Sequence, residues 1–273
     1  MTPKQFIALN AIFTAAEFAA TLGDRAPASH DSILAYHHRA GHLLRLRRGL
    51  YAAIPPGTKP DPATVDPFVL AAKLAPDSIL AYHAALAFHC NIPPVHRRFH
   101  YLTATAPREF RFGRNIFSPV HFPNALRVHG QTLWGVQDVQ RNGITLRVTS
   151  VERTVVDVLD RLELGGRLEE SWRSAEAFEH LDLDRVVEYV LLLGSATTAA
   201  KVGLFLSQHC GNLKVSDSHL ATLRRHLPVS PHYIQQRRRL AGDAIRLVRD
   251  WNIIVPKKLF LLPGKSRGRR QSV

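Results

Sequence analysis

Apolar residues recur at helical spacing three times within the first 40 residues, and two short apolar runs follow. A spacing of three or four residues places side chains on one face of a helix. Residues at this spacing are Phe6, Leu9 and Ile12 in the first stretch, Phe18 and Leu22 in the second, and Ile33, Tyr36 or His37, and Ala40 in the third. The pattern predicts three short helices.

Capping residues mark the ends of these helices. Thr14 is suited to begin the second helix and Ser29 the third, because a side-chain hydroxyl can accept a hydrogen bond from a first-turn N–H. Gly23 and Gly41 are suited to end them, since glycine readily adopts the left-handed backbone conformation.

The two apolar runs are expected to form a hairpin. Residues 43–46 and 50–53 are mostly apolar, and the basic turn at residues 47–49 separates them. A glycine in a short turn between apolar runs is typical of a β-hairpin. Three helices followed by a basic hairpin are the plan of a winged helix-turn-helix domain, which we predict for residues 1–56.

A proline-rich segment separates this domain from a second one. Residues 55–62 contain four prolines, which disfavour helices and central strands and form a stiff linker. We therefore predict a second domain at residues 63–273. Strand patterns fall at 100–105, 108–112, 116–122, 133–139, 144–148 and 251–255, and helix patterns at 64–74, 78–90, 150–162, 166–179, 182–193, 196–210 and 216–227.

The predicted fold class is α+β. An N-terminal winged helix-turn-helix is followed by a mixed domain with a small β-sheet and a C-terminal helical bundle. A basic tail at residues 263–273 ends the chain.

The composition is that of a soluble globular protein. Hydrophobic residues make up 45% of the 273 residues, too many for a largely disordered chain. The two cysteines, Cys90 and Cys210, are far apart and suit neither a disulfide framework nor a zinc site. The N-terminus lacks the features of a signal peptide, and no apolar stretch is long enough to cross a bilayer. We expect a cytoplasmic protein without a membrane partner.

The net charge of +14 is unevenly distributed along the chain. Residues 221–273 carry 13 basic and 2 acidic residues, a net charge of +11, whereas residues 151–220 carry 7 and 12, a net charge of −5. Residues 1–58 have a net charge of only +3. A surplus of this size indicates a polyanionic partner, and its uneven distribution indicates a modular chain.

The strongest functional pattern lies in the N-terminal domain. In a helix-turn-helix, the second helix of the pair reaches base edges in the major groove, and a wing contacts neighbouring phosphates. The predicted DNA-binding residues are Ser29, His30, Ser32, His38 and Arg39 on the third helix and Arg45, Arg47 and Arg48 on the hairpin. Because histidines are mostly neutral at pH 7, we expect recognition to need a dimer or cooperative neighbours. The alternative is a small helical domain with an ordinary solvated basic turn.

A second basic surface is a further candidate for nucleic-acid binding. Its arginines are Arg97, Arg98, Arg224, Arg225, Arg237, Arg238, Arg239, Arg246 and Arg249. The partner would be more DNA or an RNA. The alternative is intramolecular pairing with the acidic helices predicted at residues 151–220.

One segment combines residue types found in active sites, but a structural explanation is simpler. Residues 149–157 contain Glu, Arg, Thr and Asp. Thr149 and Glu152 fit a helix capping box, and Arg153 with Asp157 fits an i, i+4 ion pair. We therefore expect this segment to be structural.

Metal and phosphate-loop patterns are incomplete. His96 and His100 have no third ligand nearby in the sequence. Residues 194–201 resemble a phosphate loop but lack its second glycine, and a helix cap at Ser195 or Thr197 explains them. We expect no catalytic residue, no metal and no cofactor, and a protein that is not an enzyme.

Several segments together resemble the AbiEi antitoxins of bacterial type IV toxin–antitoxin, or abortive-infection, systems. The matching segments run in order along nearly the whole chain. They are 13–18 (FTAAEF), 41–51 (GHLLRLRRGLY), Pro55, 82–89 (YHAALAFH), 148–157 (VTSVERTVVD), 200–206 (AKVGLFL) and 251–255 (WNIIV). The chain departs from the family at Lys201 and Val202, where an Arg-Leu pair is usual, and in its basic tail.

The resemblance implies a protein with two activities. The winged helix would bind inverted repeats in its own promoter and repress transcription, as an autorepressor in a phage-defence operon. The C-terminal domain would neutralise a cognate nucleotidyltransferase-like toxin without forming a stable complex with it. The alternatives are a stand-alone DNA-binding transcriptional regulator and a nucleic-acid-processing enzyme such as a nuclease.

Overall fold

The protein has a mixed α+β fold in a computed structural model. The structure describes residues 1–23, 27–91, 97–105, 108–164, 168–176, 178, 180–240, 242 and 244–260. The basic tail predicted at residues 263–273 lies outside them. The chain forms two compact units, the first made of Met1–Leu80, Arg97–His121 and Val136–Val148, and the second of Ala81–His96, Phe122–Gly135 and Thr149–Val273. The predicted boundary at the proline-rich linker stays a prediction.

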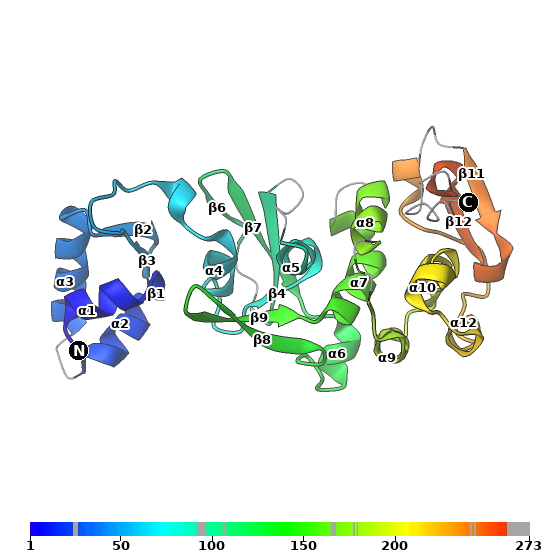
Figure 1. The fold of residues 1–273 in the computed structure, drawn as a ribbon, viewed down its shortest axis with the longest axis horizontal. Helices are drawn as coiled ribbons and strands as arrows, with labels where there is room; N and C mark the ends of the chain where they lie inside the picture. Colours follow the sequence, from blue (N-terminus) through cyan, green and yellow to red (C-terminus); the bar gives the residue numbers. More distant parts are fainter. Residues whose placement is uncertain are drawn as a thin grey trace, which may run out of the picture. The chain divides into compact units, whose positions relative to one another are not determined.

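Residues 1–53 of the first unit form what we call the N-terminal module, drawn in the blue shades of Figure 1. Its strands form an antiparallel sheet in the order β1-β3-β2. Its elements are α1 (Pro3–Leu9), β1 (Ile12–Thr14), α2 (Ala15–Leu22), α3 (Pro27–Arg39), β2 (Leu43–Arg47) and β3 (Leu50–Ala53). The rings of Phe6, Phe13 and Phe18 are buried together, with the Phe6 centroid 5.0 Å from that of Phe13 and 5.3 Å from that of Phe18.

Two local predictions in this module need correction. Ile12 does not extend the first helix, because it pairs with Ala52 and so begins β1. Ser29 does not cap α3, which already begins at Pro27, where the fixed φ of proline suits a first helical position. The cap at Thr14 is confirmed, since its hydroxyl accepts from the Glu17 N–H at 3.1 Å and the Glu17 carboxylate accepts from the Thr14 N–H at 2.7 Å.

The rest of the first unit is built on a six-stranded mixed sheet in the order β6-β7-β5-β4-β9-β8 (Figure 1). Its strands are β4 (Ile79–Leu80), β5 (Arg98–Thr103), β6 (Phe110–Phe112), β7 (Asn115–His121), β8 (Val136–Arg141) and β9 (Ile144–Thr149). The short helix η1 (Pro62–Thr64) and α4 (Pro67–Ala72) precede them, and α4 packs on β5 with the Phe68 and Phe99 rings 5.2 Å apart.

The strand β4 was not predicted. A helix over residues 78–90 fits the sequence pattern, but Ile79 and Leu80 pair with β5, and Leu80 also pairs with Val148 of β9. Both residues are fully buried, so a continuous apolar run here belongs to a central strand and not to a helix. The helix begins only at Tyr82.

Helices dominate the second unit. They are α5 (Tyr82–His89), α6 (Asn124–Val128), α7 (Val151–Asp160), η3 (Leu162–Leu164), α8 (Leu168–Ala175), α9 (Leu183–Leu193), α10 (Ala196–Gln208), α11 (Cys210–Leu213), α12 (Asp217–Arg224), η4 (Arg237–Leu240), η5 (Arg249–Trp251) and η6 (Lys257–Phe260). None of the described helices of the protein is long and apolar enough to span a bilayer.

A three-stranded sheet in the order β10-β12-β11 accompanies these helices. Its strands are β10 (His232–Tyr233), β11 (Ile245–Val248) and β12 (Ile253–Pro256). The sequence indicated only the last strand, and it placed its start at Trp251, which lies in η5. Trp251 is buried, and its indole packs directly on Gly203 of α10, where a side chain would collide with it.

Candidate nucleic-acid interface

Helix α3 has one buried and one exposed face. His30, Leu34 and His37 are buried, at a spacing of four and then three residues. The exposed residues are Asp31, Ser32, Ala35, Tyr36, His38, Arg39. This distribution answers which of Tyr36 and His37 faces inward, because His37 is buried and Tyr36 is 59% exposed.

The predicted DNA-binding residues of α3 divide between these faces. Ser32, His38 and Arg39 are exposed, while Ser29 is half-buried. The His38 Nδ1 lies 3.0 Å from the Leu43 main-chain oxygen, and the Arg39 Nε donates to the Ala35 oxygen at 3.3 Å. A guanidinium has five N–H donors, so the Arg39 bond leaves capacity for a phosphate or a base edge.

His30 has a structural position and does not join the exposed face. Its ring is 7% exposed and lies edge-on to Phe18, with the centroids 6.2 Å apart. Tyr36 is the exposed residue that the helical pattern did not single out, since an aromatic residue at helical spacing is expected to face the core.

The hairpin between β2 and β3 separates its three arginines. Arg45 and Arg48 are exposed, whereas Arg47 is half-buried and donates to the Leu74 main-chain oxygen at 2.6 Å. The register shifts between Arg45 and Arg47, which pair with Tyr51 and Leu50. Such a bulge redirects the side chains that follow it, so two arginines that would share a face of a regular strand have different surroundings.

A histidine pair connects the end of α3 with the start of β2. The Nδ1 atoms of His37 and His42 lie 3.2 Å apart. Burial lowers the pKa of His37, and repulsion from His42 and Lys4 lowers it further. His37 is therefore a neutral support of α3 near pH 7 and adds no charge to its exposed face.

The predicted patch at Arg97 and Arg98 is partly neutralised. Arg97 is exposed, while Arg98 donates to Glu109 and to the Ser118 hydroxyl, both at 2.5 Å. The hydrogen bond from Arg98 is the largest of the influences that hold the pKa of Glu109 below its usual value. Arg98 is therefore committed to an ion pair at the surface.

The C-terminal arginines lie on aromatic rings. Arg224 lies 5.0 Å from the Trp251 ring centroid, Arg246 lies 4.7 Å from that of Phe260, and Arg237 lies 6.0 Å from that of Tyr233. Arg225 and Arg249 are exposed, and Arg238 and Arg239 belong to η4, with side chains outside the described part.

Intramolecular pairing with the acidic helices accounts for little of this charge. Lys258 pairs with Glu169 at 2.8 Å, but the structure gives no ion pair to the described side chains among these arginines. Stacking on a ring leaves the charge of a guanidinium uncompensated. These arginines therefore keep their charge available at the surface.

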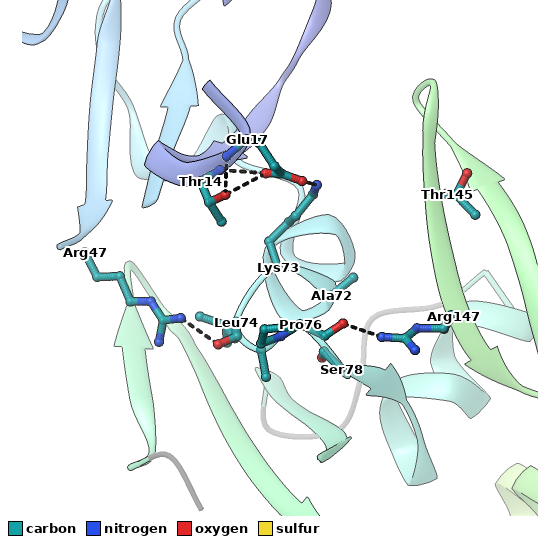
Figure 2. Close-up of a pocket in the computed structure, with 11 residues that line it drawn as sticks. Thr14, Glu17, Arg47, Ala72, Lys73, Leu74, Pro76, Ser78, Thr145 and Arg147 are labelled. Carbon is teal, nitrogen blue, oxygen red and sulfur yellow. Dashed lines mark hydrogen bonds and ion pairs between the residues drawn. The ribbon is translucent and has the colours of Figure 1, made fainter. Parts of the chain in front are cut away.

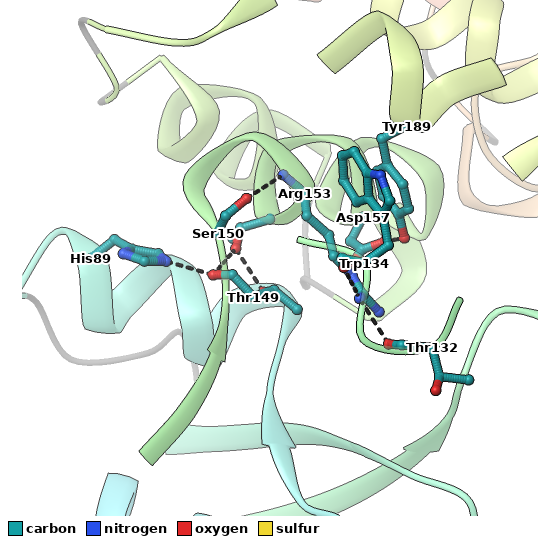
Figure 3. A network of polar contacts seen from close by, with 9 residues as sticks. His89, Thr132, Trp134, Thr149, Ser150, Arg153, Asp157 and Tyr189 are labelled. Atoms are coloured by element: carbon teal, nitrogen blue, oxygen red, sulfur yellow. Dashed lines mark hydrogen bonds and ion pairs between the residues drawn. The ribbon is translucent and has the colours of Figure 1, made fainter. Parts of the chain in front are cut away.

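Residues 149–157 form a buried network, shown in Figure 3. The Arg153 Nε lies 3.4 Å from the Asp157 carboxylate, which also accepts from the Tyr189 hydroxyl at 2.7 Å. Arg153 also donates to the main-chain oxygens of Thr132, at 3.1 Å, and Trp134. Arg153 is fully buried and Asp157 is 2% exposed, so the i, i+4 pair is confirmed and positions its helix.

The cap of this helix differs from the prediction by one residue. Ser150, and not Thr149, accepts the hydrogen bond from the Arg153 N–H, at 3.4 Å. The Thr149 hydroxyl instead bonds Thr154, and Glu152 accepts from the Asp182 N–H at 3.4 Å (Figure 3 shows Thr149, Ser150 and Arg153). The carboxylate that a capping box requires is thus used in a contact 30 residues away.

The remaining segments with possible chemistry are structural where the structure describes them. The cap at Ser195 is confirmed, since it accepts from the Thr198 N–H at 3.2 Å, and Gly194 ends the preceding helix with a φ of +62°. His100 is buried in β5, and His96 lies outside the described residues. Within the described ranges, no three or more His, Cys, Asp or Glu residues are grouped as metal ligands would be.

No protein-family model matches the chain, and no curated protein matches it. Among solved structures, it is similar to the crystal structure of the RV2827C protein from Mycobacterium tuberculosis. The TM-score is 0.57 and the sequence identity 18%, and the similarity covers 93% of this chain and 89% of that one. At this identity the similarity concerns the fold, and it extends over nearly the whole chain.

Proposed function

We propose that the protein is a DNA-binding transcriptional repressor whose N-terminal module is a winged helix-turn-helix. The observation that carries the proposal is the exposed face of α3, with Ser32, Tyr36 and Arg39, in a module that also exposes Arg45 and Arg48 on its hairpin. The element order α1-β1-α2-α3-β2-β3 is that of a winged helix, in which the third helix enters the major groove.

The exposed residues suit separate contacts with DNA. Arg39 and Ser32 can contact base edges or phosphates, and Tyr36 can donate its hydroxyl to a phosphate. Arg45 and Arg48 suit the phosphates beside the groove. One module offers few charges, so binding would depend on two copies at inverted repeats, which fits an autorepressor that recognises its own promoter.

The second part of the proposal is an antitoxin activity, which rests on the resemblance to the AbiEi antitoxins. The chain would neutralise a nucleotidyltransferase-like toxin without forming a stable complex with it. The exposed arginines of the second unit support contact with a polyanion such as RNA, because they lie on aromatic rings and keep their charge.

Two measurements test the two activities separately. Fluorescence anisotropy with the DNA upstream of the gene should show saturable binding that scrambled DNA of equal length does not. Co-expression with the product of a neighbouring nucleotidyltransferase-like reading frame should restore growth. Operator binding without any growth rescue would favour a stand-alone transcriptional regulator, and absence of sequence-specific binding would refute the repressor.

A further inference from the structure

A cavity of about 570 Å3 lies in the first unit, where the N-terminal module meets the turn after α4 (Figure 2). Its volume is in the range of sites for small molecules. The lining residues come from α2, β2, β9 and the segment that follows α4. They are Thr14, Glu17, Arg47, Ala72, Lys73, Leu74, Ala75, Pro76, Ser78, Thr145 and Arg147.

Cations outnumber carboxylates in this lining. Arg47, Lys73 and Arg147 are basic, and Glu17 is the single acidic residue among them. The Lys73 ammonium pairs with Glu17, so these two charges compensate each other. Two guanidinium charges remain in the wall of the cavity.

Both guanidinium groups are held in place by neutral partners. Arg47 donates to the Leu74 oxygen and Arg147 to the Pro76 oxygen, each at 2.6 Å, from opposite sides of the same turn (Figure 2). A peptide oxygen orients a guanidinium but carries no formal charge to neutralise it. Each arginine thus has a fixed position and unused N–H donors.

The nearby carboxylate of Asp77 does not occupy these donors. It accepts from the Thr103 hydroxyl at 2.6 Å and from the Ala104 N–H at 2.5 Å. The hydroxyl of Thr145 adds a donor to the lining, because it already accepts from the Gln140 amide at 2.7 Å and keeps its own proton.

From this lining we infer that the cavity binds a small phosphorylated molecule, with Arg47 and Arg147 as its binding residues. Two preoriented guanidinium groups suit the oxygens of a phosphate, since an arginine can donate two parallel hydrogen bonds to it. A volume of about 570 Å3 admits a molecule of nucleotide size and not only a bare ion.

Binding at this site would change the surroundings of the hairpin. Arg47 ends β2, and its neighbour Arg48 is exposed in the turn that follows. A phosphate on Arg47 would hold this end of the hairpin against the turn after α4 and so alter the affinity for DNA. This coupling rests on the proposed DNA-binding function, whereas the binding of the molecule does not.

Isothermal titration calorimetry on the full chain tests the binding, with inorganic phosphate, pyrophosphate and ATP as probes at physiological ionic strength. We expect saturable binding of pyrophosphate or ATP and a loss of about tenfold or more in affinity in Arg147→Gln. Glutamine can still donate to the Pro76 oxygen, so the unliganded variant should keep the melting temperature of the wild type.

A matched control is Arg111→Gln. Arg111 lies on β6 of the same unit, its side chain is 71% exposed, and it does not line the cavity. The control should bind the probes as the wild type does. Equal losses in both variants, or no saturable binding of any probe, would overturn the proposal.

A third measurement separates a small molecule from a nucleic-acid backbone as the source of the phosphate. If Arg147→Gln weakens DNA binding while no small probe binds, the cavity contacts the DNA backbone and the inference is wrong. If the probes bind but the chain does not bind DNA, the site stands and the repressor proposal fails.

Discussion

Arg47 and Leu74 are joined by a hydrogen bond of 2.6 Å from the guanidinium to the main-chain oxygen, although 27 residues separate them. The arginine at the end of the hairpin is thereby directed toward the turn after α4. Arg48, its neighbour in the sequence, is exposed. Two arginines that look equivalent in the sequence therefore have different tasks.

This difference predicts unequal effects on DNA binding. Arg48→Ala should lower operator affinity and reduce the slope of log K against log salt concentration by about 0.9, the value for one lost phosphate contact. Arg47→Ala should change the slope less, because its guanidinium is held by Leu74. Anisotropy titrations at several salt concentrations measure both slopes. A slope unchanged in Arg48→Ala would remove the hairpin from the interface.

The two faces of α3 predict opposite phenotypes. Arg39→Ala should weaken operator binding by about 1–3 kcal/mol if the side chain reads a base, with unfolding unchanged. His30→Ala should instead lower the free energy of unfolding by about 2 kcal/mol or more, because its buried ring packs on Phe18. Urea denaturation and anisotropy distinguish the two effects. Normal DNA binding by a stably folded Arg39→Ala would contradict the proposed orientation of α3.

His83 predicts a dependence of stability on pH. Burial lowers the pKa of His83 from 6.5 to about 4, against a smaller opposing influence of Glu170. The unfolded chain then binds more protons than the folded one between these values. Stability should therefore be complete above pH 6.5 and fall by up to about 3 kcal/mol as the pH drops toward 4.

A variant isolates this contribution from that of Asp157. Burial raises the pKa of Asp157 to about 6 in spite of Arg153, so its contribution falls with rising pH and opposes that of His83. His83→Gln can keep a hydrogen bond to the Ser171 hydroxyl, which lies 3.3 Å from the ring. The difference between wild type and variant in urea denaturation should shrink from pH 7 to pH 5. A constant difference would show that His83 titrates normally.

Gly203 predicts a strong steric effect. A β-carbon at this position would lie 2.0 Å from the Trp251 ring, well inside the contact distance. Gly203→Ala should therefore lower the free energy of unfolding by about 1–3 kcal/mol or more, because the indole must move. Gly211→Ala is the control, since nothing lies within 4 Å of its β-carbon. Equal stability of both variants would refute the close approach.

Local features were predictable from the sequence to a large extent. The cap at Thr14, the hairpin turn at Gly49 and the i, i+4 pair of Arg153 each depend on residues a few positions apart. The strand at Ile79 and Leu80 was missed because pairing with distant strands, and not local spacing, makes an apolar run a strand.

The candidate site followed the same division. The sequence located α3 and the hairpin, and it named Ser32, Arg39 and Arg48, which are exposed. The inward turn of Arg47 could not be predicted, since it depends on a bulge and on a partner 27 residues away. The cavity lined by Arg147 likewise depends on tertiary contacts that no local pattern encodes.

Glu17 uses its two oxygens for two different purposes, as Figure 2 shows. One accepts from Thr14 at the start of α2, and the other pairs with Lys73, 56 residues further along the chain. Glutamine would keep the capping hydrogen bond but lose the charge, and aspartate is too short for the usual capping box. The position thus accepts fewer residue types than either interaction would alone, and one side chain ties the start of a helix to the placement of the whole N-terminal module.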